Sequence, residues 1–353
     1  MAVGFVYSTD ESKITELAGL TLREYYRDLR LMVWAQERAH ESIRRELGVL
    51  RQGYVLSRGH VLDAEAMGCR VVWPEDEEPM VAAPALSAPA QICNFRPVDP
   101  PDNPVAHREL SRAKEFFELT GQKTSIGFNG PVTVASLCLG QGEFYTLSAL
   151  DTGLAEELAR RVTAAVIAWK RYHDTEMGIR PEDGLGLADD SASFLSPPLF
   201  ARLSLPYLKE WYEAFPGYDS RSLHICGDST HFLGQLHALG LTSFDLGEMV
   251  DLAKAKVLLP RTYIWRIADF RVIRDGDRDE IETCIGTDLA AGAPGGHFGI
   301  HVEGWRGVPL WKGKAVKDLI DHYNHEQGDI LWPNSQSTVA SKLWVACKHP
   351  SSG

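Results

Sequence analysis

Residues 222–228 read Ser-Leu-His-Ile-Cys-Gly-Asp, a short apolar segment that leads into a Gly-Asp turn. Side chains two positions apart on a β-strand lie on the same side, so we expect His224 and Cys226 to point in one direction. An imidazole nitrogen and a thiolate are ligands that suit zinc. The segment therefore predicts a strand with a metal site at its end. The alternative is a hydrogen-bonded core histidine beside a buried cysteine, because a His-x-Cys pattern is short.

Strand-like and helix-like segments alternate around this motif. We expect strands at residues 124–128, 184–188, 222–225, 242–246, 262–267 and 298–302. We expect helices at residues 154–176, 198–215, 230–239, 279–289 and 314–325. Such alternation with short connections is typical of parallel strands joined by right-handed crossovers. No Gly-x-Gly-x-x-Gly motif follows a strand, which argues against a dinucleotide-binding domain. The predicted fold class is α/β, a single (β/α)8 barrel of the TIM type.

The N-terminal part of the chain has a different pattern. Residues 20–47 are rich in Leu, Arg, Glu and Ala, contain no proline and place apolar residues at helical spacing. We therefore divide the chain into an N-terminal helical extension, residues 1–48, packed on a barrel domain, residues 49–353. Residues 79–104 are rich in Pro and Ala and are expected to form a long loop.

Composition narrows the classes of function. The chain has 353 residues, 44% of them hydrophobic, which is enough for a large core. The net charge of −12 and the lack of a basic run argue against nucleic-acid binding. Six scattered cysteines without a Cys-x-x-Cys pair indicate reduced thiols in the cytoplasm. No secretory signal or membrane-length apolar run is visible, so we expect no membrane partner.

Several segments together resemble the uroporphyrinogen decarboxylase superfamily. Residues 128–140 are similar to its Gly-Pro-x-Thr turn and helix, and residues 189–200 to its Asp-containing Leu-Ser-Pro segment. Residues 224–227, His-Ile-Cys-Gly, match its His-x-Cys-Gly strand end, and residues 250–256 resemble the helix that follows. The resemblance covers roughly residues 50 to 325. It implies a TIM-type barrel and one of two chemistries: decarboxylation of porphyrinogen acetates without a cofactor, or zinc-dependent methyl transfer of the methylcobalamin:coenzyme M type.

The positions that define the decarboxylases differ in this chain. The decarboxylases have an Arg-Gln-Ala-Gly-Arg segment and a catalytic aspartate in Phe-Ser-Asp-Ile-Leu. The first is missing here, and residues 56–61, Leu-Ser-Arg-Gly-His-Val, place Arg58 or Gly59 at the aspartate position. This departure favours the zinc-dependent, corrinoid-linked methyltransferase branch. A divergent decarboxylase-like carboxy-lyase is the alternative, and a non-catalytic barrel that binds zinc or a partner is a third possibility.

In the methyltransferase branch the resemblance implies three zinc ligands. Two correspond to His224 and Cys226, whereas the third, a distant cysteine near the last strand, has no counterpart. Residues 300–305, Ile-His-Val-Glu-Gly-Trp, occupy that region, and Glu303 is the first candidate for the third ligand. His301 is the second candidate, and both would point the same way from a strand. A solvated loop acid is the alternative role for Glu303.

Other polar residues are expected at the C-terminal ends of strands, where barrel enzymes place their active sites. Asp190 is a candidate catalytic residue that orients the substrate or supports His224, with a turn cap as the alternative. Asn129, Arg58 and Arg266 are candidate substrate-binding residues. Their alternatives are a turn role, a surface loop position and an ion pair with Asp269, respectively.

These observations combine into one functional hypothesis. Asp190, His224 and Cys226 form the expected catalytic set, with zinc as the cofactor. The sequence has no Asp-x-His-x-x-Gly cobalamin motif, so the corrinoid is expected on a separate partner protein. We therefore expect a methyltransferase that moves a methyl group between a small methyl donor or thiol acceptor and that corrinoid.

Overall fold

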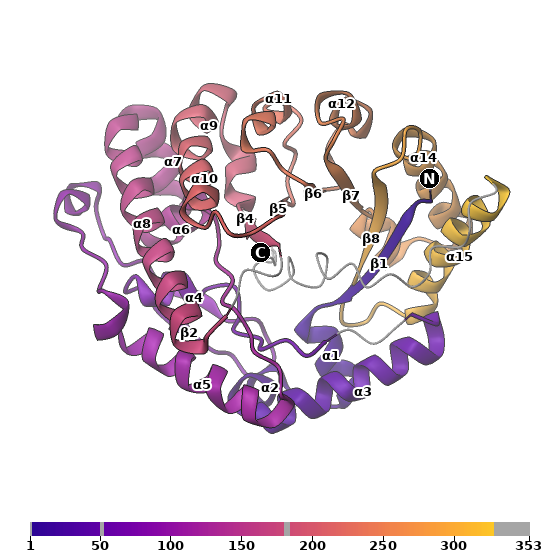
Figure 1. Ribbon diagram of the computed structural model, residues 1–353, viewed down its shortest axis with the longest axis horizontal. Helices are drawn as coiled ribbons and strands as arrows, with labels where there is room; N and C mark the ends of the chain where they lie inside the picture. The colour runs from indigo at the N-terminus through magenta and orange to yellow at the C-terminus, as the bar shows by residue number, and fades with distance from the viewer. Residues whose placement is uncertain (1, 50–52, 180–183, 328–353) are drawn as a thin grey trace.

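The main element of the fold is a curved sheet of six parallel strands (Figure 1). The computed structural model describes residues 2–49, 53–179 and 184–327. The order across the sheet is β1-β8-β7-β6-β5-β4. The bounds of these strands are β1 Gly4–Thr9, β4 Leu185–Ala188, β5 Arg221–Ile225, β6 Ser243–Leu246, β7 Tyr263–Ile267 and β8 Phe298–Gly304. Strands β4 to β8 therefore follow one another in space as they do in the sequence, which confirms the α/β barrel-type fold.

The segment that leads to Asn129 lies beside β4, where a further barrel strand was expected. Asn129 forms an isolated parallel bridge with Ala188 of β4, but residues 124–128 form no regular strand, so that prediction was wrong. The side-chain amide of Gln122 explains part of the difference. It accepts a hydrogen bond from the Tyr54 backbone N–H at 3.1 Å and donates one to the Tyr54 carbonyl at 2.7 Å. A side chain thus satisfies backbone groups that a ladder would otherwise pair.

The N-terminal region is helical as expected but also contributes a strand. Its helices are α1 Glu11–Ala18, α2 Leu22–Arg27 and α3 Leu29–Leu47. Before them, β1 pairs in parallel with residues 299–304 of β8. The sequence analysis did not expect this strand, because its pairing partner lies at the other end of the chain. A domain boundary at residue 48 stays a prediction.

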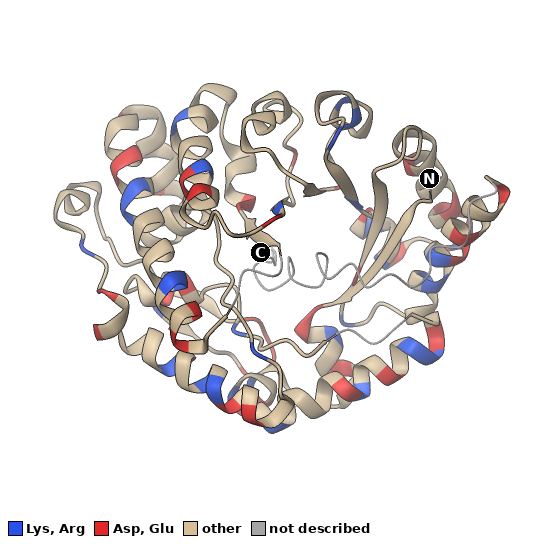
Figure 2. Cartoon of the chain, viewed as in Figure 1, with Lys and Arg blue, Asp and Glu red and all other residues tan. Residues whose placement is uncertain are grey.

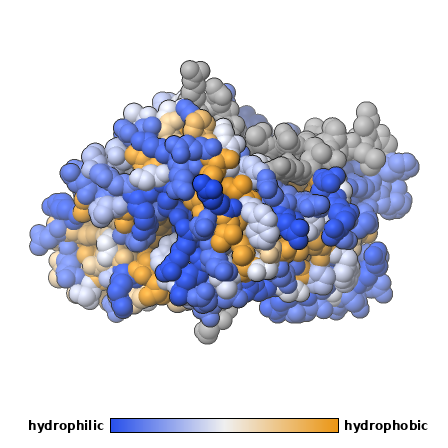
Figure 3. Space-filling view, turned by 90° about the horizontal axis from the view of Figure 1, so that it is seen from below, coloured by the Kyte–Doolittle hydropathy of each residue, from blue (hydrophilic) through white to orange (hydrophobic). Residues whose placement is uncertain are grey.

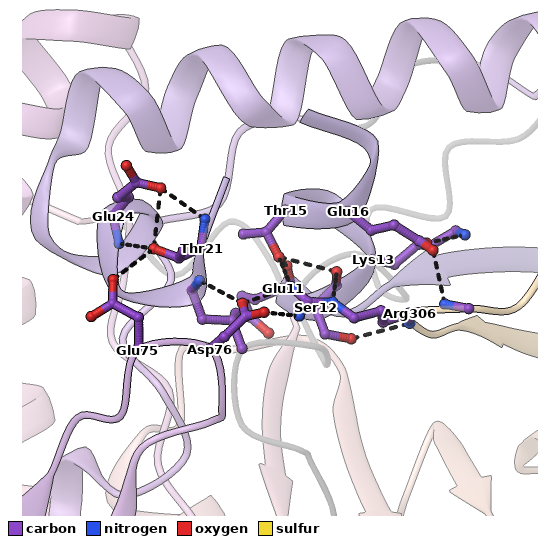
Figure 4. Close-up of polar contacts among 12 residues, drawn as sticks. Glu11, Ser12, Lys13, Thr15, Glu16, Thr21, Glu24, Glu75, Asp76 and Arg306 are labelled. Atoms are coloured by element: carbon purple, nitrogen blue, oxygen red, sulfur yellow. Dashed lines mark hydrogen bonds and ion pairs between the residues drawn. The ribbon is translucent and has the colours of Figure 1, made fainter. Parts of the chain in front are cut away.

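The loop after β8 is attached to the N-terminal helices (Figure 4). The Arg306 guanidinium donates to Asp76 and, at 3.0 Å, to the Thr15 hydroxyl. The backbone N–H of Gly307 donates to Glu16 Oε1 at 3.0 Å, and Lys13 Nζ donates to the Val308 carbonyl at 2.7 Å. These contacts hold α1 against the C-terminal end of β8.

Helices cover the outer, convex side of the sheet and continue the ring beyond its edges (Figure 1). Beyond the N-terminal region they are α4 Leu62–Ala66, α5 Pro104–Thr120, α6 Pro131–Leu139, α7 Gln141–Leu150, α8 Thr152–Met177, α9 Pro197–Leu203, α10 Leu205–Ala214, α11 Leu233–Leu236, α12 Leu252–Leu258, α13 Phe270–Asp275, α14 Arg278–Gly292 and α15 Leu310–Glu326. The expected helix 198–215 is divided into α9 and α10 at Ser204, because Pro206 begins a new helix. Charged side chains of both signs follow the outer helices (Figure 2).

Residues 79–104 are more ordered than the expected long loop. Strand β3, Met80–Ala83, pairs antiparallel with β2, Arg70–Val72, and two short 3-10 helices follow at Pro89–Asn94 and Pro100–Asp102. The face of the molecule in Figure 3 is mostly hydrophilic, with separate hydrophobic patches between polar side chains. Among the described helices, none combines the length and the apolar character that crossing a membrane requires.

Trp265 of β7 fills the inside of the sheet on the side away from the strand ends. A Cβ atom at Gly299 of β8 would lie 2.4 Å from its Cζ3, and one at Gly4 of β1 would lie 2.9 Å from its Cη2. Glycine at these two positions therefore makes room for the indole. The indole therefore occupies the interior of the sheet near the N-terminal ends of β1 and β8.

Candidate active site

Asp190, His224 and Cys226 converge at the C-terminal ends of β4 and β5. The Cys226 thiol donates to His224 Nε2 at 2.6 Å, and Asp190 Oδ1 lies 3.5 Å from the same nitrogen. The Cys226 backbone N–H donates to Asp190 Oδ1 at 2.8 Å. The candidate ligand atoms of the three residues all lie within 4.8 Å of one another. The structure thus brings together the three residues of the expected catalytic set, and it places the Asp190 carboxylate, which was not expected as a ligand, among the candidate ligand atoms.

The donor set fits a zinc ion. It offers one imidazole nitrogen, one thiol sulfur and one carboxylate oxygen, and three protein ligands leave a coordination position for a substrate. Burial raises the pKa of the Cys226 thiol well above its usual range, and the charges of Asp190 and Glu303 raise it further. A thiolate at this position therefore needs a cation beside it, and a bound metal meets that need.

Asp245 of β6 supports His224 from the neighbouring strand. The two residues are register partners, and His224 Nδ1 lies 2.9 Å from Asp245 Oδ2. Burial alone would raise the pKa of Asp245, but the imidazoles of His301 and His224 outweigh it and hold that pKa well below its usual range. The sequence analysis missed this residue, although an acid inside the apolar segment 243–246 was a visible signal.

His301 of β8 lies on the other side of Asp245. Its Nδ1 is 3.1 Å from Asp245 Oδ2, and its Nε2 is 2.6 Å from the Ser8 hydroxyl of β1. Burial lowers the pKa of His301, but the Asp245 carboxylate raises it more, so the net direction is upward. Both ring nitrogens thus have partners, and His301 supports Asp245 in this structure. Its role as a third zinc ligand stays a prediction.

Glu303 faces the same site from the end of β8. It lies two residues after His301, so both side chains are on one side of the strand, and it is the register partner of Ser8. Its charge contributes to the raised pKa of Cys226 and of His301. The carboxylate that joins His224 and Cys226 within ligand distance is, however, that of Asp190. Coordination by Glu303 therefore also stays a prediction.

The structure does not bring Arg58 or Arg266 to this site. Arg58 is buried between α5 and residues 124–125, with its Nε 3.5 Å from Glu109 Oε2 and its Nη1 3.4 Å from the Ser125 carbonyl. Burial lowers the pKa of Arg58 to about 10. Arg266 alternates with the inward Trp265 and so lies on the outer side of β7. Its Nε is 3.2 Å from Asp288 Oδ1 of α14, and its Nη1 donates to the Gly247 carbonyl at 2.7 Å.

Asn129 ties two loops together near the site. Its side-chain amide donates to Asp63 Oδ2 at 2.9 Å and to the His60 carbonyl at 2.7 Å. Burial lowers the pKa of the His60 imidazole to about 4. The nearby charge of Asp190 raises this pKa, but by less than burial lowers it. His60 is thus a neutral side chain near Asp190. By donating to the His60 carbonyl, the amide of Asn129 positions the loop that carries His60.

Comparison with known proteins identifies the class to which this fold and site belong. Residues 9–282 match the family described as uroporphyrinogen decarboxylase (URO-D). The chain therefore belongs to the uroporphyrinogen decarboxylase family, as the sequence motifs predicted.

Two solved structures are similar to this one. A methyltransferase from Methanosarcina mazei superposes with a TM-score of 0.69 and 21% identity, covering 91% of this chain and 94% of that chain. A B12-independent methionine synthase from Shewanella sp. W3-18-1, in complex with selenomethionine, has a TM-score of 0.46 and 11% identity, covering 85% of this chain and 90% of that chain. No curated protein sequence matches significantly. The first similarity shows that this chain shares the fold of a methyltransferase.

Proposed function

We propose that the protein is a zinc-dependent methyltransferase that moves a methyl group between a small methyl donor or thiol acceptor and a corrinoid carried by a partner protein. The observation that carries the proposal is the convergence of Asp190, His224 and Cys226 at the C-terminal ends of β4 and β5. Membership of the uroporphyrinogen decarboxylase family and the fold shared with a methyltransferase support it.

Each residue of the candidate site would have a separate role. Zinc held by Asp190, His224 and Cys226 would lower the pKa of a substrate thiol or activate a methyl donor in the open position. Asp245 accepts the Nδ1–H of His224 and thereby leaves Nε2 facing the ligand set. Asp190 also accepts the Cys226 backbone N–H, which orients the turn that carries the thiol. Trp265 packs against Gly4 and Gly299 in the interior of the sheet.

The corrinoid partner would approach from the C-terminal side of the strands. Phe194 follows β4 and Met249 follows β6, and they are 75% and 66% exposed at this side of the sheet. Exposed apolar side chains around a site are typical of protein contact surfaces. The proposal also places the reaction in the reducing cytoplasm. The described cysteines, which are Cys69, Cys93, Cys138, Cys226 and Cys284, are free thiols, in agreement with that location.

A decarboxylase-like lyase is the alternative from another class. Such an enzyme has to hold the carboxylates of its substrate, and arginine is the usual residue for that role. Arg58 and Arg266, which the sequence suggested, instead pair with Glu109 and Asp288 outside the site. This geometry weighs against the lyase.

Metal analysis tests the proposal directly. We expect about one zinc per chain in the purified protein, a loss of zinc in Cys226→Ala, and full zinc content in Cys93→Ala, which removes an exposed thiol elsewhere. Comparison of Asp190→Ala with Glu303→Ala identifies the third ligand. Methyl donors and thiols are then assayed with free cobalamin. A protein that takes up no zinc, or that transfers no methyl group from any donor while loaded, would contradict the proposal.

A further inference from the structure

We propose that Thr133 is a positioning residue of the metal site, because its hydroxyl holds the residues on both sides of Asp190. The inference rests on the proposed function, in which the Asp190 carboxylate binds zinc, and it adds a residue that does not itself bind the metal. It also gives a physical reason for the contact between residues 128–140 and residues 189–200, two of the segments that carry the family resemblance.

The Asp190 carboxylate needs support from outside its own turn. Asp190 begins the short 3-10 helix Asp190–Phe194, which follows β4. Its Oδ1 lies 3.5 Å from His224 Nε2, and its side chain is 20% exposed. Hydrogen-bond geometry in a 3-10 helix is poorer than in an α-helix, so such a turn fixes its first side chain only weakly. The direction of this carboxylate therefore depends on contacts that other elements make with the turn.

The Thr133 side chain supplies these contacts from the first turn of α6. Its Oγ1 donates a hydrogen bond to Asp189 Oδ1 at 3.1 Å, and the same oxygen accepts one from the Ser191 backbone N–H at 3.2 Å. The Thr133 backbone N–H also donates to Asp189 Oδ1, at 2.9 Å. One side chain thus holds the residue before Asp190 and the residue after it.

Asp189 connects this contact to the core. Its side chain is buried, and its Oδ2 accepts a hydrogen bond from Ser204 Oγ at 2.9 Å. Its backbone N–H donates to the His224 carbonyl of β5 at 3.0 Å. Glycine is required at residue 130, because a Cβ atom on Gly130 would collide with the Asp189 side chain. The turn that carries Asp190 is therefore fixed to α6 and to β5 at the same time.

The zinc affinity of Thr133→Val tests the inference, because valine has nearly the volume of threonine but no hydroxyl. Competition with a chromophoric chelator should show an affinity about 10- to 100-fold below that of the wild-type protein. Thr133→Ser keeps the hydroxyl and should restore nearly the full affinity. Thr163→Val is the matched control, since the Thr163 hydroxyl donates to the Ala159 carbonyl within α8, and its affinity should be unchanged. A wild-type affinity in Thr133→Val would overturn the inference.

A double-mutant cycle separates positioning of the ligand from a general loss of structure. In Asp190→Ala, which lacks the carboxylate, adding Thr133→Val should leave zinc affinity nearly unchanged. An equal loss of affinity with and without the Asp190 carboxylate would contradict the inference, because a merely structural role acts in both backgrounds. Thr133→Ala, which also lacks the hydroxyl, decides the question if the valine variant fails to fold. A wild-type protein that takes up no zinc would contradict the proposed function, and the inference with it.

Discussion

Oδ2 of Asp245 lies 2.9 Å from Nδ1 of His224, on the adjacent strand β5. An ionised carboxylate accepts hydrogen bonds and donates none, so this contact requires the hydrogen of His224 to be on Nδ1. The lone pair of Nε2 then faces Cys226 and Asp190. The metal-binding state of the imidazole is therefore set by a residue that does not itself belong to the ligand set.

Replacing this carboxylate should weaken metal binding. In Asp245→Asn the amide of residue 245 can donate to Nδ1 and favour the other tautomer, so we expect zinc affinity to fall about 10- to 100-fold. Competition with a chromophoric chelator measures the affinity, and circular dichroism checks the fold. Ser8→Ala, which removes the hydroxyl at the far side of His301, should have a smaller effect. Equal affinities for wild-type protein and Asp245→Asn would show that the carboxylate does not orient the ligand.

Gly247 is required by the close approach of β6 to the Cys226 backbone. A Cβ atom at residue 247 would lie 1.6 Å from the Cys226 carbonyl oxygen, so Gly247→Ala has to displace the turn that holds the thiol. We expect a loss of stability of about 1–3 kcal/mol in urea denaturation, together with reduced zinc content. Gly286→Ala in α14 is the matched control, because nothing lies within 4 Å of its Cβ position. An equal response of the two variants would contradict this account.

Arg58 should act on stability, not on substrate affinity. In Arg58→Ala the buried Glu109 carboxylate loses this buried guanidinium but keeps its ion pair with Arg108, so we expect a loss of about 1–3 kcal/mol in chemical denaturation. Zinc content and thiol affinity of the folded variant should stay at wild-type values. Arg202→Ala, which removes an exposed pair with Glu156, should leave stability nearly unchanged. A folded, stable Arg58→Ala protein with weakened thiol binding would instead support the substrate-binding role that the sequence suggested.

Glu78 should make stability depend on pH. Burial, aided by the charge of Asp10, raises the pKa of Glu78 from 4.5 to about 7 despite a hydrogen bond from Tyr26. Between these values the folded state binds more protons than the unfolded state. The contribution of Glu78 to the free energy of unfolding is therefore fully present below about pH 4.5. It falls by up to about 3 kcal/mol as the pH rises to 7. Urea denaturation across this range should show a flatter profile for Glu78→Gln, and identical profiles would contradict the assignment.

Local patterns in the sequence predicted much of the fold and, with the family motifs, the three candidate residues Asp190, His224 and Cys226. The two-residue period of a strand places His224 and Cys226 on one side whatever surrounds them, and the amphipathic periods of α8, α14 and α15 were visible for the same reason. The family motifs also predicted the barrel-type fold and the membership of the uroporphyrinogen decarboxylase family.

The tertiary structure decided what lies opposite those residues. Asp190 and Asp245 reach His224 from β4 and β6, and Ser8 reaches His301 across the ends of the chain, because parallel strands align residues that are distant in sequence. The packing of β7 also decided the position of Arg266. A strand exposes alternate residues to opposite sides, and the side on which Arg266 lies depends on which of its neighbours, here Trp265, fills the barrel.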